Sequence, residues 1–114
     1  MSYATQMEAA RNGILTPQMA QILADEKIER NVLLERVAAG RIAIPANKHH
    51  PNLKAKGVGE GLSTKINVNL GVSEDCCNVE LELDKVRTAI DLKTDAIMDL
   101  STFGNTHAFR RRAV

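Results

Sequence analysis

Aromatic residues are nearly absent from this chain of 114 residues. It has no tryptophan, and its aromatic side chains are Tyr3, Phe103 and Phe109. Proteins that bind single-stranded nucleic acid or cationic ligands often stack them on aromatic rings, so the composition gives no sign of such a site. Apolar residues nevertheless make up 44% of the chain, as in globular proteins. We therefore expect a folded core of leucine, isoleucine, valine, alanine and methionine.

The chain also lacks an excess of charge of either sign. Its 15 basic and 14 acidic residues give a formal net charge of +1, which argues against nucleic acid or an anionic membrane as the main partner. The one basic run is Arg110-Arg111-Arg112. We predict that this run is a solvated helix face, with a phosphate contact as the alternative.

Long apolar segments and a leader sequence are missing as well. No apolar stretch approaches the roughly 18 residues that span a bilayer. The N-terminal sequence MSYATQMEAARNG has no basic segment followed by an apolar one, as a secretory signal would have. Cys76 and Cys77 are adjacent, a spacing that hardly allows a normal disulfide between them. We therefore expect reduced thiols and a cytoplasmic location.

No set of residues has catalytic or metal-binding spacing. His49 and His50 are neighbours in sequence, and adjacent histidines rarely point at one ion, so we interpret them as surface loop residues. The cysteine pair lacks the spacing of a zinc or iron–sulfur motif. We predict no catalytic residue and no metal ligand in this chain.

Capping signals and apolar spacing predict three short helices in the first part of the chain. Thr5 and Glu8 fit a capping box. Thr16, followed by a proline, starts a second helix, and a third is predicted at about residues 28–39. With a short extended stretch after them, these helices form a helical N-terminal segment at residues 1–46.

A long connecting loop, rich in glycine and lysine, is predicted at residues 47–63. A loop of this length in a compact domain is unusual and often functional. Its glycines at 57, 59 and 61 precede a predicted strand, whereas those of the dinucleotide fingerprint follow one. We interpret them as a flexible or tightly turned loop, with close backbone approach to an anionic group as the alternative.

Residues 64–114 show the pattern of a strand, a helix, a second strand and the start of another helix. Apolar and polar residues alternate in 64–70, which predicts a strand with three apolar side chains on one face: Ile66, Val68 and Leu70. A helix is predicted at about 79–93, with a buried face formed by Val79, Leu83, Val86 and Ile90. The second strand is expected at 96–100.

Two strands joined through a helix imply parallel pairing. Two parallel strands cannot bury both faces of a sheet, and a complete parallel barrel needs about 250 residues. The sequence therefore predicts an α/β fold in which residues 64–114 are the first βαβ unit of a truncated parallel (β/α)8 barrel. We expect the chain to be a fragment, a truncated gene product or one piece of a larger assembly.

Polar residues lie at the ends of the two predicted strands. Asn67 and Asn69 share one face of the first strand, and Met98 and Asp99 lie near the end of the second. In parallel barrels the groups that do chemistry lie at the C-terminal ends of strands. Asparagine offers donors and acceptors that can bind the edge of a heterocycle or ribose. The alternative is a structural asparagine whose side chain bonds to backbone.

Four ordered motifs resemble the phosphomethylpyrimidine synthase family. TQM, AAR and GILTP, within residues 5–17, are similar to the family's opening, and GRIAIPAN at 40–47 is similar to its GR-I-IPAN segment. TKINVNLG at 64–71 and DAIMDLST at 95–102 resemble its first two barrel strands. Together the motifs cover essentially the whole chain.

The resemblance implies a non-classical radical S-adenosylmethionine lyase of thiamin biosynthesis. It would rearrange aminoimidazole ribonucleotide to hydroxymethylpyrimidine phosphate, with a 4Fe-4S cluster on a C-terminal cysteine motif and a zinc site with histidine ligands. Both ligand sets are absent from this chain. The family's motifs imply that Asn69 and Met98 bind the substrate, with Asn67, Asp99 and Ser101 as neighbouring candidates.

Two alternatives stay open. A sister branch of the family converts the same substrate to 5-hydroxybenzimidazole, a cobamide lower base, and Phe103 together with the KINVNLG string favours it. The second alternative is a non-catalytic truncated or interaction domain, whose exposed sheet edge pairs with another chain. The resemblance also implies a homodimer at full length, and we expect no activity from the 114-residue chain alone.

Overall fold

The side chain of Thr5 fixes where the first helix begins in the computed structural model, which describes residues 2–114. Its hydroxyl accepts a hydrogen bond from the backbone N–H of Glu8, and helix α1 (Gln6–Arg11) follows. The Glu8 carboxylate in turn accepts the N–H of Ala4 at 2.7 Å. This is the predicted reciprocal pairing of Thr5 and Glu8, although the return bond reaches one residue further back than in a standard capping box.

A second threonine, Thr16, starts helix α2 (Pro17–Asp25) and is itself buried. Its hydroxyl accepts the N–H of Met19 at 3.2 Å and donates to the side chain of Gln6 at 2.6 Å. The proline loses no helical bond, because the N–H at the first position has no partner inside a helix. Thr16 therefore caps α2 and also ties it to α1.

Helix α3 (Arg30–Ala38) begins two residues later than the apolar spacing predicts. Apolar side chains of the three helices, together with Ile42, form the core of a first compact unit, which ends at Thr64. Its buried members are Ala9, Ala10, Met19, Ile22, Leu33, Leu34, Val37 and Ile42. Burial of a large aliphatic side chain contributes roughly 1.5–3 kcal/mol, so this cluster holds helices that are too short to be stable alone.

Strands β1 (Ile42–Ala43) and β2 (Val58–Gly59) pair antiparallel in the first unit. β2 lies within residues 47–63, which the sequence predicts to be a loop. The glycines explain the difference. Gly59 has a φ of 148°, and a Cβ there would lie 2.2 Å from the carbonyl oxygen of Arg41. Glycine is therefore required for the two backbones to approach this closely.

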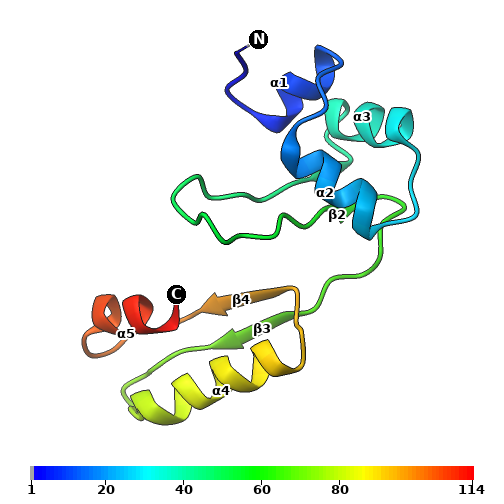
Figure 1. Ribbon diagram of the computed structural model, residues 1–114. Helices are drawn as coiled ribbons and strands as arrows, with labels where there is room; N and C mark the ends of the chain where they lie inside the picture. The colour runs from blue at the N-terminus through cyan, green and yellow to red at the C-terminus, as the bar shows by residue number, and fades with distance from the viewer. Residues whose placement is uncertain (1) are drawn as a thin grey trace. The chain divides into compact units, whose positions relative to one another are not determined.

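The second unit (Lys65–Val114) consists of a strand, a helix, a strand and a further helix. Its elements are β3 (Asn67–Leu70), α4 (Val79–Asp91), β4 (Ala96–Asp99) and α5 (Thr106–Ala113). β3 and β4 are parallel, and α4 runs alongside them in the opposite direction (Figure 1). The predicted parallel pairing through a helix is confirmed, and the mixture of helices and strands is compatible with the predicted α/β class.

The first strand of this unit is shorter than predicted. The alternation predicts a strand over 64–70 that includes Ile66, whereas β3 begins at Asn67 and Ile66 is 57% exposed. The N–H of Ile66 donates to the Asp95 carboxylate, and its carbonyl accepts the N–H groups of Asp95 and Ala96. These bonds join the start of β3 to the start of β4 without burying the Ile66 side chain.

Helix α4 buries part of its predicted apolar face. Leu83 and Val86 are buried and pack with Leu70 of β3 and Phe109 of α5. Ile90 was predicted on the same face, but it lies one turn beyond this cluster and is 62% exposed. A face that periodicity predicts is buried only where a neighbouring element covers it.

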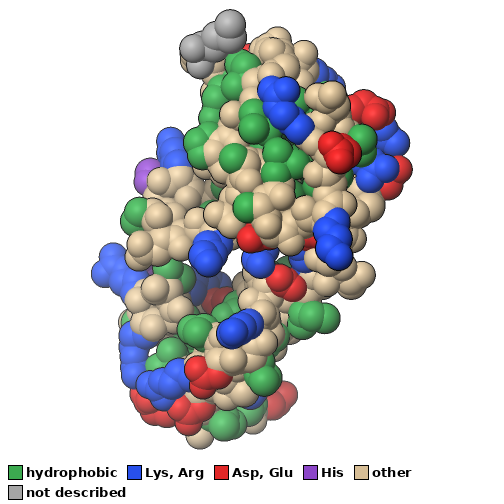
Figure 2. All heavy atoms as spheres, turned by 45° about the vertical axis from the view of Figure 1, so that its right-hand side comes forward, with side chains coloured by type: hydrophobic (Ala, Val, Ile, Leu, Met, Phe, Trp, Pro, Cys, Tyr) green, Lys and Arg blue, Asp and Glu red, His purple; other side chains and the backbone are tan. Residues whose placement is uncertain are grey.

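Charges of both signs lie close together on the surface. Basic and acidic side chains are neighbours on the face that Figure 2 shows. In the first unit Arg41 pairs with Glu35 and Glu60, and in the second Arg112 pairs with Glu80. Among residues 2–114, no helix is long and apolar enough to cross a bilayer.

Replacing Thr16 by alanine is expected to destabilise the first unit by about 1–2 kcal/mol, because an N-cap side chain contributes that much. Urea denaturation followed by circular dichroism measures the loss. Thr5→Ala is the matched control, since it removes an exposed cap of a shorter helix and should cost less. Equal losses in the two variants would contradict a special role for the buried bond between Thr16 and Gln6.

Candidate functional site

The predicted site residues lie on β3 and β4, which end at the same edge because the strands are parallel. Asn69 is opposite Met98 in the register, and Asn67 is opposite Ala96. Successive side chains of a strand point to opposite faces. Asn67, Asn69 and Met98 therefore share one face of the strand pair, whereas Leu70 lies on the other face, in the core.

The face that carries Asn67, Asn69 and Met98 is open. Both asparagines are exposed, and Met98 is 49% exposed. The Asn67 amide nitrogen donates to Oδ1 of Asn69 at 2.9 Å, which aligns the two side chains. The pair then presents the Asn69 amide nitrogen as a donor, next to an adaptable thioether. This arrangement suits a planar polar ring, bonded at its edge and packed against an apolar side chain.

Asp99 and Ser101 belong to a different network, on the helix-bearing side of the strands. Asp99 is opposite Leu70 in the register and shares its face. Oδ1 of Asp99 accepts the Ser101 N–H at 2.9 Å and the Ser101 hydroxyl at 2.5 Å, and Oδ2 accepts Nε of Arg110 at 2.5 Å. The Ser101 hydroxyl also accepts the N–H of Val72 at 3.0 Å. Both carboxylate oxygens are therefore engaged in joining β3, β4 and α5.

These contacts lower the pKa of Asp99 below its ordinary value. Partial burial by itself raises the pKa, but the hydrogen bonds from Ser101 and Arg110 and the charge of Arg110 outweigh it. Asp99 is therefore a charged anchor at neutral pH and is poorly suited to act as a general acid.

The sequence did not reveal the role of Glu82, which is 1% exposed in α4. One of its carboxylate oxygens accepts the N–H of Gly71 at 2.9 Å, and the other accepts Nζ of Lys85 at 2.5 Å. The Lys85 hydrogen bond lowers the pKa of Glu82, and the Gly71 bond adds to this, against burial, which raises it. Glutamate and leucine alternate at 80–83, and nothing in that spacing marks Glu82 as buried.

The basic run of α5 is exposed, as predicted, and two of its arginines also make ion pairs. Arg110 pairs with Asp99, and Arg112 pairs with Glu80 at 2.8 Å. Exposed ion pairs of this kind contribute little to stability. A phosphate contact by this run stays a prediction.

No group of three or more histidine, cysteine, aspartate or glutamate residues is arranged to hold a metal ion in the described part of the chain. Cys76 and Cys77 are exposed and free of disulfides. His49 and His50 are exposed in the loop that follows β1. The structure therefore brings none of these four residues into a ligand set.

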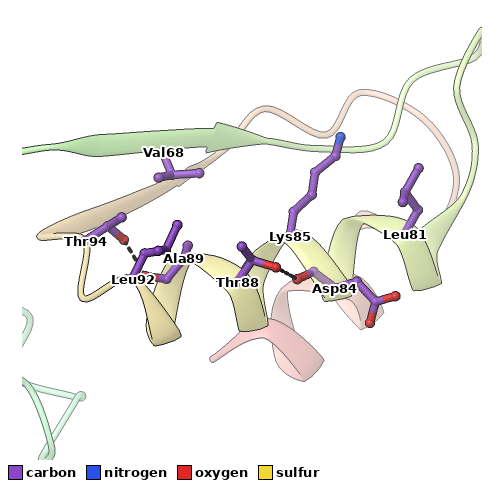
Figure 3. A pocket seen from close by; sticks show the side chains of 8 residues that line it. All are labelled: Val68, Leu81, Asp84, Lys85, Thr88, Ala89, Leu92 and Thr94. Carbon is purple, nitrogen blue, oxygen red and sulfur yellow. Dashed lines mark hydrogen bonds between the residues drawn. The ribbon is translucent and has the colours of Figure 1, made fainter.

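A largely apolar groove of about 340 Å³ runs along α4 beside β3 (Figure 3). Most of its apolar surface comes from Val68 of β3, from Leu81 and Ala89 of α4, and from Leu92 at the end of α4. None of the residues that line it belongs to β4, so the groove lies toward the edge of β3 that β4 leaves free. Leu81 and Leu92 are 46% and 72% exposed, which leaves an apolar surface there.

The first unit has a separate, more polar pocket of about 380 Å³. Gln6 of α1 and Gln18 of α2 line it and share a hydrogen bond of 3.2 Å. The loop after β1 adds Asn47, Lys48 and His50 to the lining. The three come from the loop that the sequence marks as unusually long.

Comparison with known proteins identifies the family. The family model described as the radical SAM ThiC family matches residues 5–114. The chain belongs to this family. Relatives named phosphomethylpyrimidine synthase are similar along its whole length: the Fusobacterium nucleatum protein is 63% identical over 112 residues, or 98% of the chain, and the Alkaliphilus metalliredigens protein is 58% identical over 114 residues. The family resemblance of the four sequence motifs is confirmed.

The chain spans about a quarter of the length of these relatives. It covers 26% of the Fusobacterium nucleatum protein and 25% of the Clostridium tetani protein, to which it is 58% identical. The comparison therefore assigns this segment to the family.

The anchor formed by Asp99 should make the second unit sensitive to acid. A carboxyl group whose pKa is lowered by folding adds stability above its unfolded value, here 3.8, and this stability is lost as the pH falls through the lower folded pKa. Urea denaturation between pH 7 and pH 3 should show a smaller loss for Asp99→Asn than for the unchanged chain. Asp91→Asn, at an exposed position at the end of α4, is the control and should keep the full acid dependence. Identical pH profiles for Asp99→Asn and the unchanged chain would disprove the anchor.

Proposed function

We propose that this chain is part of a phosphomethylpyrimidine synthase, a radical S-adenosylmethionine lyase. It would rearrange aminoimidazole ribonucleotide to hydroxymethylpyrimidine phosphate in thiamin biosynthesis. The observation that carries the proposal is the pairing of Asn69 with Met98 across two parallel strands, in a segment 63% identical to a protein of that name.

In the proposed enzyme, β3, α4, β4 and α5 begin a (β/α)8 barrel. The parallel register and the crossover helix support this arrangement. The free edge of β3 and the apolar groove beside it also support it, because barrel closure covers the outer edge of the first strand with the last strand and its helix. Leu81 and Leu92 would then be covered.

Asn69 and Met98 would bind the substrate at the C-terminal rim of the barrel. The Asn69 amide would bond to a polar edge of the aminoimidazole or ribose, and Met98 would pack against the ring. Asn67 would act through its hydrogen bond to Asn69. Asp99 and Ser101, both committed to the network with Arg110, would support the rim.

The residues described here do not fit the cofactors that such an enzyme needs. A 4Fe-4S cluster requires several cysteine thiolates, whereas Cys76 and Cys77 are adjacent and exposed. A zinc site requires three or four converging ligands, and residues 2–114 contain no such group. We therefore assign cluster, S-adenosylmethionine and zinc to other parts of the full-length protein, and we derive no step through them.

A chimera tests the proposal directly. Joining this chain to the remaining part of the Fusobacterium nucleatum relative should give an enzyme that turns over aminoimidazole ribonucleotide and restores growth without thiamin to a strain lacking the synthase. Asn69→Ala in the chimera should lower kcat/KM by at least about tenfold, since a lost substrate hydrogen bond lowers transition-state stabilisation.

The control is Asn31→Ala, at an exposed asparagine of α3, which should leave kcat/KM unchanged. A chimera that folds and carries its cluster but shows no turnover, beside an active parent enzyme, would contradict the proposal. Equal activity of Asn69→Ala and the unchanged chimera would contradict the role of Asn69.

A further inference from the structure

Glu82 is a charged residue in a place where packing alone favours an apolar one. It lies in α4 next to Leu83, with Val86 one turn further, and all three side chains are buried. A buried carboxylate is unfavourable unless its oxygens are bonded. Both Glu82 oxygens are bonded, one to the Gly71 N–H and one to Lys85. The bond to Lys85 stays within α4, whereas the bond to Gly71 connects α4 to the turn after β3.

Gly71 is the first residue beyond β3, and it lies against the exit of β4. A Cβ at Gly71 would be 2.5 Å from the backbone nitrogen of Ser101 and 2.7 Å from the carbonyl carbon of Leu100. Directly before it, the Leu70 carbonyl accepts the Leu100 N–H at 2.7 Å. The position of Gly71 therefore sets how closely the ends of the two strands approach.

Asn69 precedes Gly71 by two residues and faces the open side, opposite Met98. Glu82 lies on the helix side, and its two carboxylate oxygens bond to Gly71 and Lys85 and not to the site residues. Its bond to Gly71 holds the backbone two residues after Asn69. A carboxylate forms a stronger bond to a backbone N–H than a neutral acceptor does. This hydrogen bond therefore constrains the backbone next to the site from the face of the strand opposite the site.

We propose that Glu82 is a positioning residue of the substrate site, which fixes the exit of β3 so that Asn69 stands at the correct place beside Met98. The inference rests on the proposed function for the identity of the substrate. The role of Lys85 is secondary, since its side chain is 48% exposed and its bond stays within α4.

The test uses the active chimera and steady-state kinetics with aminoimidazole ribonucleotide. Glu82→Ala should raise KM for this substrate by about tenfold, because small misplacements of binding groups weaken substrate contacts. Glu82→Gln keeps an oxygen that accepts the Gly71 N–H and should recover most of that loss. Glu80→Gln, at an exposed position two residues earlier on α4, is the control and should leave KM unchanged.

A purely structural role gives a different result. Partial unfolding lowers the amount of active enzyme, and so reduces apparent kcat while KM for aminoimidazole ribonucleotide stays constant. A rise in KM for that substrate, with KM for S-adenosylmethionine unchanged, supports positioning. A fall in kcat alone, or equal effects of the alanine and glutamine variants, overturns it.

Hydrogen exchange separates failure of this inference from failure of the proposed function. Peptides that cover 67–73 should exchange at least about threefold faster in Glu82→Ala than in Glu80→Gln, because the Gly71 N–H loses its acceptor. An inactive chimera that shows this difference overturns the proposed function but still supports the hydrogen bond from the Gly71 N–H to Glu82. An active chimera with unchanged exchange and unchanged KM overturns the positioning role alone.

Discussion

The second unit depends on the close contact between the exits of β3 and β4. Gly71 lies so near the backbone of Leu100 and Ser101 that no side chain fits there. Bonds from both sides maintain the contact: Glu82 accepts the N–H of Gly71, and the Ser101 hydroxyl accepts the N–H of Val72. Only a glycine leaves enough space for the two backbones to approach each other. The backbone N–H groups at this contact then need hydrogen-bond acceptors, which charged or polar side chains supply.

Because side chains on the helix-facing side bond to these backbone groups, the side chains on the opposite face remain available for other contacts. Asp99 and Ser101 have their polar atoms engaged within the fold, whereas Asn69 and Met98 remain exposed. Neighbouring residues in one short motif therefore differ in role, because alternate positions of a strand lie on different faces. The MDLST string contains both an exposed candidate for substrate contact and an internal anchor.

Local rules predicted much of this fold. The cap residues Thr5 and Thr16 are predicted correctly, because N-cap bonds span only three residues. Parallel pairing of β3 with β4 followed from the helix between them. The predicted burial of Ile90 is wrong, since burial depends on neighbouring elements that periodicity does not specify.

The candidate site could be predicted only in part. The asparagine face follows from strand alternation, and the family motifs singled out Asn69 and Met98. The pairing of Asp99 with Arg110 joins residues 11 positions apart, and that of Glu82 with Gly71 also spans 11. Such contacts depend on how α5 and α4 pack on the strands, which no spacing within one element reveals. The β2 strand was missed for the same reason, because its partner β1 lies across a long loop.

The division of the chain between Thr64 and Lys65 has a consequence during protein synthesis. The core of each unit is drawn from its own side of that division. Translation adds about 5–20 residues per second, and domains fold as units as they leave the ribosome. The three helices of the first unit have all their core partners before β3 has been made. The two strands, in contrast, emerge with an apolar groove beside an unpaired edge, so the second unit still exposes apolar surface and unpaired backbone groups after its own residues have been made.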